Sequence, residues 1–380
     1  MIKIIDKTQC CGCRVCSVVC TKKAISFIED EYGNIFPKVN EEKCINCKLC
    51  EQVCPITNET VFYEPKNTYA VKLNENVILN SASGGAFYGL AYFFLKKYKG
   101  VVYGCAYDDN MLPTIIGIED TELLSKLQGS KYAMSIISDD TYCKIKQNLK
   151  SGRKVLFSGV PCQCEAVRKF VGDDTNLYTV ELLCHGFVSY KYWQDYIGYL
   201  EKKHKAKIVD FAFRNKDKSL FVARYVARYV AHNGKIKEKV YYTNPSTSSY
   251  YYYFLSGKIY RENCYKCKFA QINRASDITI GDFWGYEGSL DISKGISVLI
   301  CNNVKGSELF SKVKRIFDYE ERDFEMAARG NGQLNFPISL SLKDYSILSE
   351  WKKRGIKYQC NQHKKYHYVA YIASKIGVFR

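Results

Sequence analysis

Two runs of cysteines near the start of the chain carry the clearest chemistry in the sequence. The first run is Cys10-x2-Cys13-x2-Cys16-x3-Cys20, and the second is Cys44-x2-Cys47-x2-Cys50-x3-Cys54-Pro55. In this spacing three thiolates of a run bind one cubane, and the fourth reaches across to a second cubane. The sequence therefore predicts two 4Fe-4S clusters, the first held by Cys10, Cys13, Cys16 and Cys54, and the second by Cys44, Cys47, Cys50 and Cys20.

Zinc is the alternative metal, because it also binds Cys-x2-Cys pairs. A zinc site uses four ligands, and it gives no reason for a third cysteine at the same spacing in both runs. The ligand count favours iron–sulfur clusters. Cys11 fits neither register, and we interpret it as a bystander.

Four later cysteines form a second candidate centre. Cys162 follows one predicted strand and Cys184 the next, so both stand at the carboxyl edge of a predicted parallel sheet, where α/β proteins bind ligands. Cys264-x2-Cys267 comes later. The four can hold a third 4Fe-4S cluster, or they can be buried free thiols, since cysteine packs as a small hydrophobe. The remaining cysteines lack ligand spacing and are expected to be free: Cys105, Cys143, Cys164, Cys301 and Cys360.

Small residues before a predicted helix suggest a site for a flavin or dinucleotide. The segment Ser81-Ala82-Ser83-Gly84-Gly85 leads into the helix, whose free N–H groups suit a pyrophosphate, although the same residues also serve as an ordinary helix cap. A glycine turn with a cation, 127–132 with Lys131, and the loop Ser158-Gly159 beside Cys162 add to this hypothesis.

The elements that must position these residues divide the chain into three parts. The sequence predicts an α+β ferredoxin-like domain over residues 1–60. It predicts a larger α/β domain over residues 61–330, with a mainly parallel sheet and antiparallel additions. Strands are predicted at 101–104, 154–157 and 177–180, helices at 86–97 and 163–171, and antiparallel strands within 208–243. Residues 331–380 predict a basic helical tail.

Composition limits the class of protein. The 380 residues are 47% hydrophobic, which is typical of globular chains, and no apolar run is long enough to span a membrane. The N-terminus lacks the sections of a signal peptide, so we expect a cytoplasmic protein. A reducing cytosol favours metal ligation over disulfides for its 18 cysteines.

The formal charge of +17 is uneven, because residues 351–380 carry eight Lys/Arg and no acid. This basic segment is expected to be a solvated surface, or a contact for a membrane surface or an acidic partner.

Several segments together resemble a known family. They are 83–86, 129–132, 159–163, 184–186, 213–216, 264–267 and 277–285. Over residues 1 to about 330 the chain resembles the coenzyme F-420 hydrogenase/dehydrogenase beta subunit, with an N-terminal two-cluster ferredoxin domain, and its plant relative 7-hydroxymethyl chlorophyll a reductase. The resemblance implies FAD beside the third cluster, lined by Ser83, Gly84, Gly85, Lys131, Ser158 and Gly159.

His185, at the sheet edge beside Cys184, is the candidate acid or base, because imidazole titrates near neutrality; the alternative is a histidine that satisfies backbone groups. Lys131 and Arg214 are candidates to hold phosphate or an anionic substrate.

Three functions follow from these features. The first is a flavin-dependent reductase in which clusters feed FAD for an unidentified small-molecule substrate. The second is an electron-transfer subunit that relays electrons to a partner enzyme. The third, a basic iron–sulfur protein that binds nucleic acid, is not expected, because the chain has no recognised nucleic-acid module.

Overall fold

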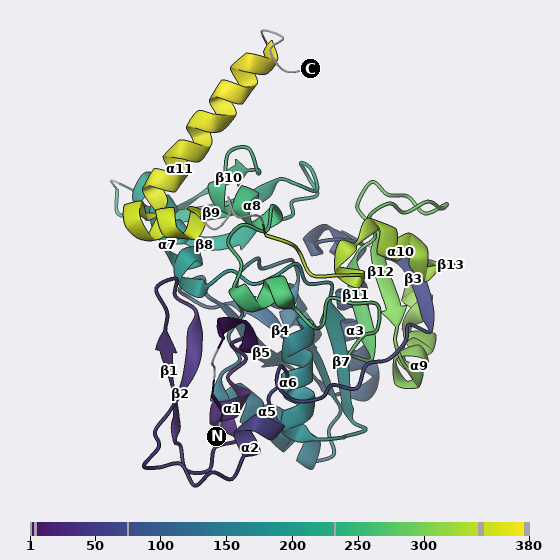
Figure 1. Cartoon of the computed structure of the whole chain (residues 1–380). Coiled ribbons are helices and arrows are strands. Elements are labelled where there is room, and N and C mark those ends of the chain that lie inside the picture. The colour runs from purple at the N-terminus through teal and green to yellow at the C-terminus, as the bar shows by residue number, and fades with distance from the viewer. Residues whose placement is uncertain (1, 4–5, 74–75, 232, 341–345, 376–380) are drawn as a thin grey trace.

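The computed structural model describes residues 2–3, 6–73, 76–231, 233–340 and 346–375 (Figure 1). It contains an N-terminal cysteine-rich unit, a central eight-stranded sheet, a three-stranded sheet and a long C-terminal helix. The domain boundaries at residues 60 and 330 remain predictions.

The N-terminal unit is a β-hairpin with two one-turn helices. Strands β1 (Ile25–Glu29) and β2 (Ile35–Val39) pair antiparallel, and the short helices α1 (Val15–Val18) and α2 (Leu49–Gln52) each begin within a cysteine run. A 3-10 turn, η1 (Lys7–Gln9), precedes the first run. The hairpin runs along one side of the molecule, next to the N-terminal end of the chain (Figure 1).

The central sheet has the strand order β13-β3-β12-β11-β7-β6-β4-β5. Its four central strands run parallel and its flanking strands antiparallel. The predicted parallel sheet with antiparallel additions is therefore confirmed. The strands are β3 (Asn67–Leu73), β4 (Val101–Tyr107), β5 (Pro113–Ile118), β6 (Val155–Gly159), β7 (Leu177–Leu182), β11 (Ile278–Asp282), β12 (Ser297–Cys301) and β13 (Phe317–Arg322).

Helices cover both faces of this sheet. On one face lie α3 (Ala86–Phe93), which continues as a π-helical turn η3 (Phe94–Tyr98), and α9 (Val304–Val313). On the other face lie α5 (Asp139–Lys150) and α6 (Pro161–Val171), and Val15 and Val53 of the N-terminal unit join their hydrophobic core. The N-terminal unit is thus packed on the face of the sheet that carries α6.

The unit β6-α6-β7 places the later cysteines. All five residues of β6 are buried, as expected for a central parallel strand covered on both faces. Its register with β7 pairs Val155 with Leu177 and Gly159 with Glu181, so both strands end at the same edge. The predicted strand–helix–strand unit is confirmed.

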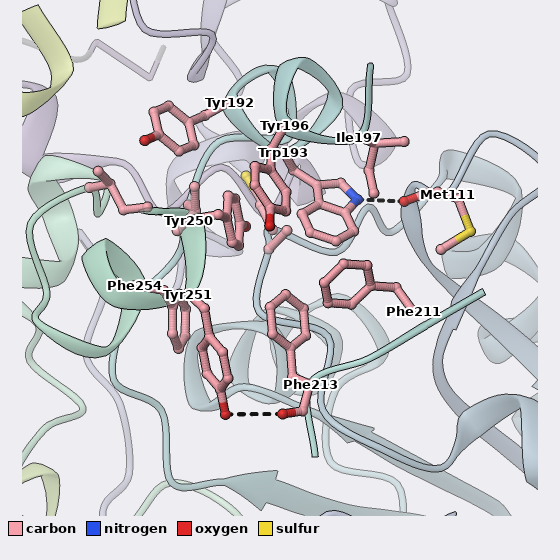
Figure 2. Packing of buried hydrophobic residues seen from close by; sticks show 14 of the residues in the cluster. Met111, Tyr192, Trp193, Tyr196, Ile197, Phe211, Phe213, Tyr250, Tyr251 and Phe254 are labelled. Carbon is pink, nitrogen blue, oxygen red and sulfur yellow. Dashed lines mark hydrogen bonds between the residues drawn. The ribbon is translucent and has the colours of Figure 1, made fainter. Parts of the chain in front are cut away.

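The second sheet lies between the central sheet and the C-terminal helix. It consists of β8 (Lys207–Ala212), β9 (Ala223–Val230) and β10 (Ile236–Thr243), all antiparallel, as predicted for residues 208–243. Helices α7 (Tyr190–His204) and α8 (Ser249–Leu255) pack on it through an aromatic core (Figure 2). Within that core Trp193 Nε1 donates to the Met111 carbonyl at 2.6 Å, and Tyr251 Oη donates to the Phe213 carbonyl at 3.0 Å.

The predicted basic tail contains helix α11 (Ser346–Lys375), which is broken at Gly355 and then projects away from the body (Figure 1). The first part of α11 belongs to the body, because Trp351 is buried and donates from Nε1 to Asp195 Oδ2 at 2.9 Å. Among the described residues, none of the helices is long and apolar enough to cross a membrane.

The remaining elements are short connections. They are η2 (Asn76–Asn80), η4 (Thr121–Leu123), α4 (Leu124–Leu127), η5 (Glu262–Lys266), η6 (Lys314–Ile316), α10 (Phe324–Gly330) and η7 (Gly332–Leu334).

Candidate metal centres

The two N-terminal cysteine loops share one backbone conformation. In the first loop Gly12 and Arg14 have φ of 72° and 69°, and at the matching positions of the second loop Asn46 and Lys48 have φ of 53° and 62°. Left-handed residues within such a loop turn successive N–H groups toward one side, which creates a concave site for an anion, including iron–sulfur clusters. In the first loop the Gly12 N–H already donates to Cys10 Sγ at 3.4 Å.

The structure brings Cys54 to the first loop. The charge of Cys54 contributes to the raised pKa values of Cys10, Cys13 and Cys16, after the larger effect of burial and neighbouring thiols. Burial raises the pKa of Cys10 to about 11. This grouping is the one predicted for the first cluster, with the fourth ligand supplied by the second run.

The ligands of the second cluster are less enclosed. Cys50 is buried and lies near Cys16. By contrast, Cys20 and Cys44 are partly buried, and Cys47 is exposed. Cys20 Sγ accepts a hydrogen bond from the Ala24 N–H at 3.3 Å. The assignment of Cys20 to this cluster stays a prediction.

The four later cysteines converge from three separate segments on one pocket. Cys162 is the second residue of α6 and Cys184 follows β7. Cys264 lies within the turn η5, and Cys267 directly follows it. All four line the pocket, together with His185 and Gln333. Burial raises the pKa of Cys264 to about 12, and the charge of Cys267 adds to it.

Backbone donors face the sulfurs of this third group. The Phe187 N–H donates to Cys264 Sγ at 3.2 Å. Backbone N–H groups of Gly186 bond to Cys184, and those of Phe269 and Ala270 bond to Cys267. Such bonds stabilise negative charge on sulfur, so the donor set suits thiolate ligands of an anionic cluster better than neutral, buried thiols.

Cys11 lies between the first and the third group. It is buried, and its thiol is hydrogen-bonded to those of Cys13 and Cys162. A residue interpreted from spacing as a bystander thus touches one predicted ligand of each group. All 18 cysteines are free thiols in the structure.

His185 stands at the mouth of the pocket. Its Nδ1 lies 2.9 Å from Gln333 Nε2, an amide nitrogen that can only donate, so His185 Nδ1 accepts and the proton of the neutral ring belongs on Nε2 of His185. Atoms packed around the ring lower its pKa, the nearby Asp282 raises it, and Arg214 lowers it further. Arg214 itself is paired with Asp282 at 3.1 Å, so it is not a free cation for a substrate.

The predicted flavin residues before α3 form a closely packed loop. A Cβ on Gly84 would lie 2.2 Å from the Val71 carbonyl and 2.5 Å from the Ser297 N, so only glycine permits this approach to β3 and β12. Gly85 is the N-cap of α3, and no side chain caps the first turn of the helix. Ser83 Oγ donates to the Ile296 carbonyl at 2.6 Å.

The other predicted flavin residues are used in part by the fold. Lys131 Nζ donates to the carbonyl of Gln128 at 2.6 Å and to two neighbouring carbonyls, so its ammonium is engaged near the end of α4. Ser158 and Gly159 are buried at the end of β6. Their role toward a flavin stays a prediction.

Lys216 is the buried cation at the loop before α3. It is the last residue of 213–216, one of the segments that carry the family resemblance. Its Nζ donates to the Ile78 carbonyl at 2.9 Å and also to the Ser83 carbonyl. Burial lowers its pKa to about 7. The sequence signal was the lysine of 213–216, but only the structure shows which loop it reaches.

Within the described part of the chain, no three His, Cys, Asp or Glu side chains are close enough to hold a single metal ion. Cubane ligands stand farther apart than zinc ligands, because each binds a different iron.

Comparisons with known proteins match two parts of the chain. Residues 9–58 match the 4Fe-4S dicluster domain, and residues 152–325 match the family described as the C terminus of the coenzyme F420 hydrogenase/dehydrogenase beta subunit. No curated protein matches the chain. The likeness to 7-hydroxymethyl chlorophyll a reductase stays a prediction.

A similar solved structure is a chain of the F420-reducing [NiFe] hydrogenase complex from Methanosarcina barkeri. It has 18% sequence identity and a TM-score of 0.45, over 78% of this chain and 91% of that chain. The two family matches cover separate parts of the chain: residues 9–58 are similar to a 4Fe-4S dicluster domain, and residues 152–325 are similar to the C terminus of coenzyme F420 hydrogenase/dehydrogenase beta subunits.

Proposed function

We propose that this chain is an iron–sulfur flavoprotein oxidoreductase that passes electrons between two ferredoxin-type clusters, a third 4Fe-4S cluster and FAD. The observation that carries the proposal is the convergence of Cys162, Cys184, Cys264 and Cys267 on one pocket, with N–H donors at three of the sulfurs. Through Cys11 this pocket adjoins the first ferredoxin loop.

The residues before α3 fit the phosphates of FAD. No side chain caps the first turn of α3 at Gly85, the positive end of the helix dipole suits an anion, and Lys216 adds a cation at the same loop. When bound, the clusters would move single electrons, and the flavin would exchange electrons singly or in pairs. The protein holds the thiolates, aims N–H groups at their sulfurs and excludes water by burial.

We assign His185 the role of holding a proton beside the third group. Gln333 fixes the tautomer with the proton on Nε2, and the lowered pKa keeps the ring neutral near pH 7. A neutral imidazole with a fixed N–H can donate a hydrogen bond from Nε2 to a substrate in the pocket. The substrate in this proposal is a small organic molecule, and we propose a cytoplasmic location, since a reducing compartment favours free thiols and metal ligation over disulfides.

A second candidate is an electron-transfer subunit that reduces a partner protein and has no substrate of its own. The description of the matched family as a beta subunit favours it, and so does the projecting basic half of α11, which offers a contact for an acidic partner. Both candidates use the same clusters, and they differ in whether the chain reduces a small molecule or only a partner protein.

Flavin quantitation after anaerobic purification tests the flavoprotein, and the two candidates are separated by whether a small molecule, or only a protein partner, reoxidises the reduced flavin. We expect about one FAD per chain, held at the loop before α3. Lys216→Gln should lose the FAD and keep its iron content. Lys218→Gln, an exposed lysine two residues away, is the matched control and should keep the flavin. A full iron complement without bound flavin would contradict the flavoprotein and support the relay.

A further inference from the structure

Arg261 lies where the N-terminal unit meets the third cysteine group. Its side chain is almost fully buried and reaches into the N-terminal unit. Nε donates to the carbonyl of Cys10 at 2.7 Å, and Nη2 donates to the carbonyl of Ile35 at 2.9 Å. The guanidinium also lies 4.2 Å from the ring centre of Phe36. The side chain therefore holds the backbone at the first predicted ligand of the first cluster.

The backbone of Arg261 serves the other group. Its N–H donates to the Phe187 carbonyl at 2.8 Å, and its carbonyl accepts from the Cys264 N–H at 2.9 Å. Phe187 in turn donates to Cys264 Sγ. One residue thus connects a ligand of the first cluster with a ligand of the third group.

The charge of Arg261 is not neutralised by the described residues. The two other arginines buried near the sheet edge have carboxylate partners, Arg274 with Glu181 and Arg214 with Asp282. In the described ranges Arg261 has no carboxylate partner, and its buried Nη1 has no hydrogen-bond partner. A buried guanidinium is stable only with a counter-charge, and the groups that it faces are thiols predicted to bind anionic clusters.

We propose that Arg261 is a positioning residue that fixes the first ferredoxin cluster against the third cluster and raises the reduction potentials of both. This inference rests on the proposed cluster ligands. Reduction adds one negative charge to a cluster, so a buried cation beside it stabilises the reduced form. A shared cation shifts both potentials in the same direction, so it changes the difference between them less than a cation beside only one cluster would.

Potentiometric titration followed by electron paramagnetic resonance tests the inference on anaerobically purified full-length protein. In Arg261→Gln we expect the potentials of the first and third clusters to fall, with at least a tenfold loss in each reduction equilibrium, about 59 mV for one electron. The second cluster should not change. Lys266→Gln removes the same charge from the same loop at a side chain 70% exposed, and it should leave all potentials unchanged.

Arg261→Lys separates charge from hydrogen bonding, and it keeps the test decisive if Arg261→Gln fails to assemble its clusters. In this variant each reduction equilibrium should stay within about threefold of the wild-type value, a shift in potential of under about 30 mV. Potentials that fall as far in Arg261→Lys as in Arg261→Gln, or that stay unchanged in Arg261→Gln, would overturn the inference. Wild-type protein without a third cluster would instead refute the proposed function.

Discussion

Arg274 and Glu181 form an ion pair at 2.6 Å, and both side chains are almost completely buried. Glu181 is on β7, three residues before Cys184, and Arg274 follows Cys267 by seven residues. Arg274 Nη1 also donates to the carbonyls of Phe269 and Gln271. The pair therefore ties the loop that carries two predicted ligands to the strand that precedes a third.

Removing one partner should leave the other charge buried and unpaired. We expect Arg274→Met to lower stability by about 3–5 kcal/mol, which for a domain of this size lowers Tm by roughly 10 °C, and to lose the third cluster. Arg228→Met breaks the exposed pair with Glu238 and should cost less than about 1 kcal/mol. Thermal unfolding with iron analysis measures both effects, and equal stability losses in the two variants would contradict this role.

Gly186 should be intolerant of any side chain. Its φ is +150°, and a Cβ there would lie 2.3 Å from the buried ring of Tyr260. Because the Gly186 N–H bonds to Cys184, we expect Gly186→Ala to displace that sulfur and to remove the third cluster. Gly152→Ala is the control, since its φ is +77° but no atom lies within 4 Å of the new Cβ. The control should cost roughly 1–2 kcal/mol and keep all its iron.

FAD affinity should depend on pH through Lys216. Burial lowers the pKa of Lys216 to about 7; the nearby Asp282 raises it, while Lys72 and Lys294 lower it. Binding of a pyrophosphate needs the protonated amine, so affinity should fall as pH rises above 7, by up to about tenfold per pH unit. Flavin fluorescence titration of flavin-free, cluster-loaded protein between pH 7 and 9 measures this.

The same titration with riboflavin, which has no phosphate, should be insensitive to pH. Lys216→Met should bind FAD weakly and with little pH dependence. An FAD affinity that is constant over this range in the wild-type protein would refute the contact between Lys216 and the phosphates.

Local patterns predicted the part of the fold that carries the cysteines. The apolar run of β6, the helix after Pro161 and the strand β7 are close in sequence, so their parallel arrangement follows from short-range rules. The same rules placed Cys162 and Cys184 at one sheet edge. The approach of Cys264 and Cys267 to that edge could not be derived from spacing, because a loop can close over many distances.

Long-range packing explains what the sequence did not predict. Strand β3 pairs with β12 and β13, more than 200 residues later, and no local pattern encodes such partners. Arginine and lysine are usually exposed, so the burial of Arg261, Arg274 and Lys216 is visible only once their partners are in place. Trp351 belongs to the body for the same reason, although its segment is basic.

Iron analysis of anaerobically purified protein tests the central claim most directly, with two cysteines of α6 as a matched pair. The wild-type chain should carry about twelve irons and Cys162→Ala about eight, on the ligand count of three cubanes. Cys164→Ala should keep about twelve, since that thiol lies buried against the carbonyls of Gly159 and Val180, to which it donates. About eight irons in the wild-type protein, unchanged in Cys162→Ala, would contradict the third cluster, and zinc in place of iron would contradict the account as a whole.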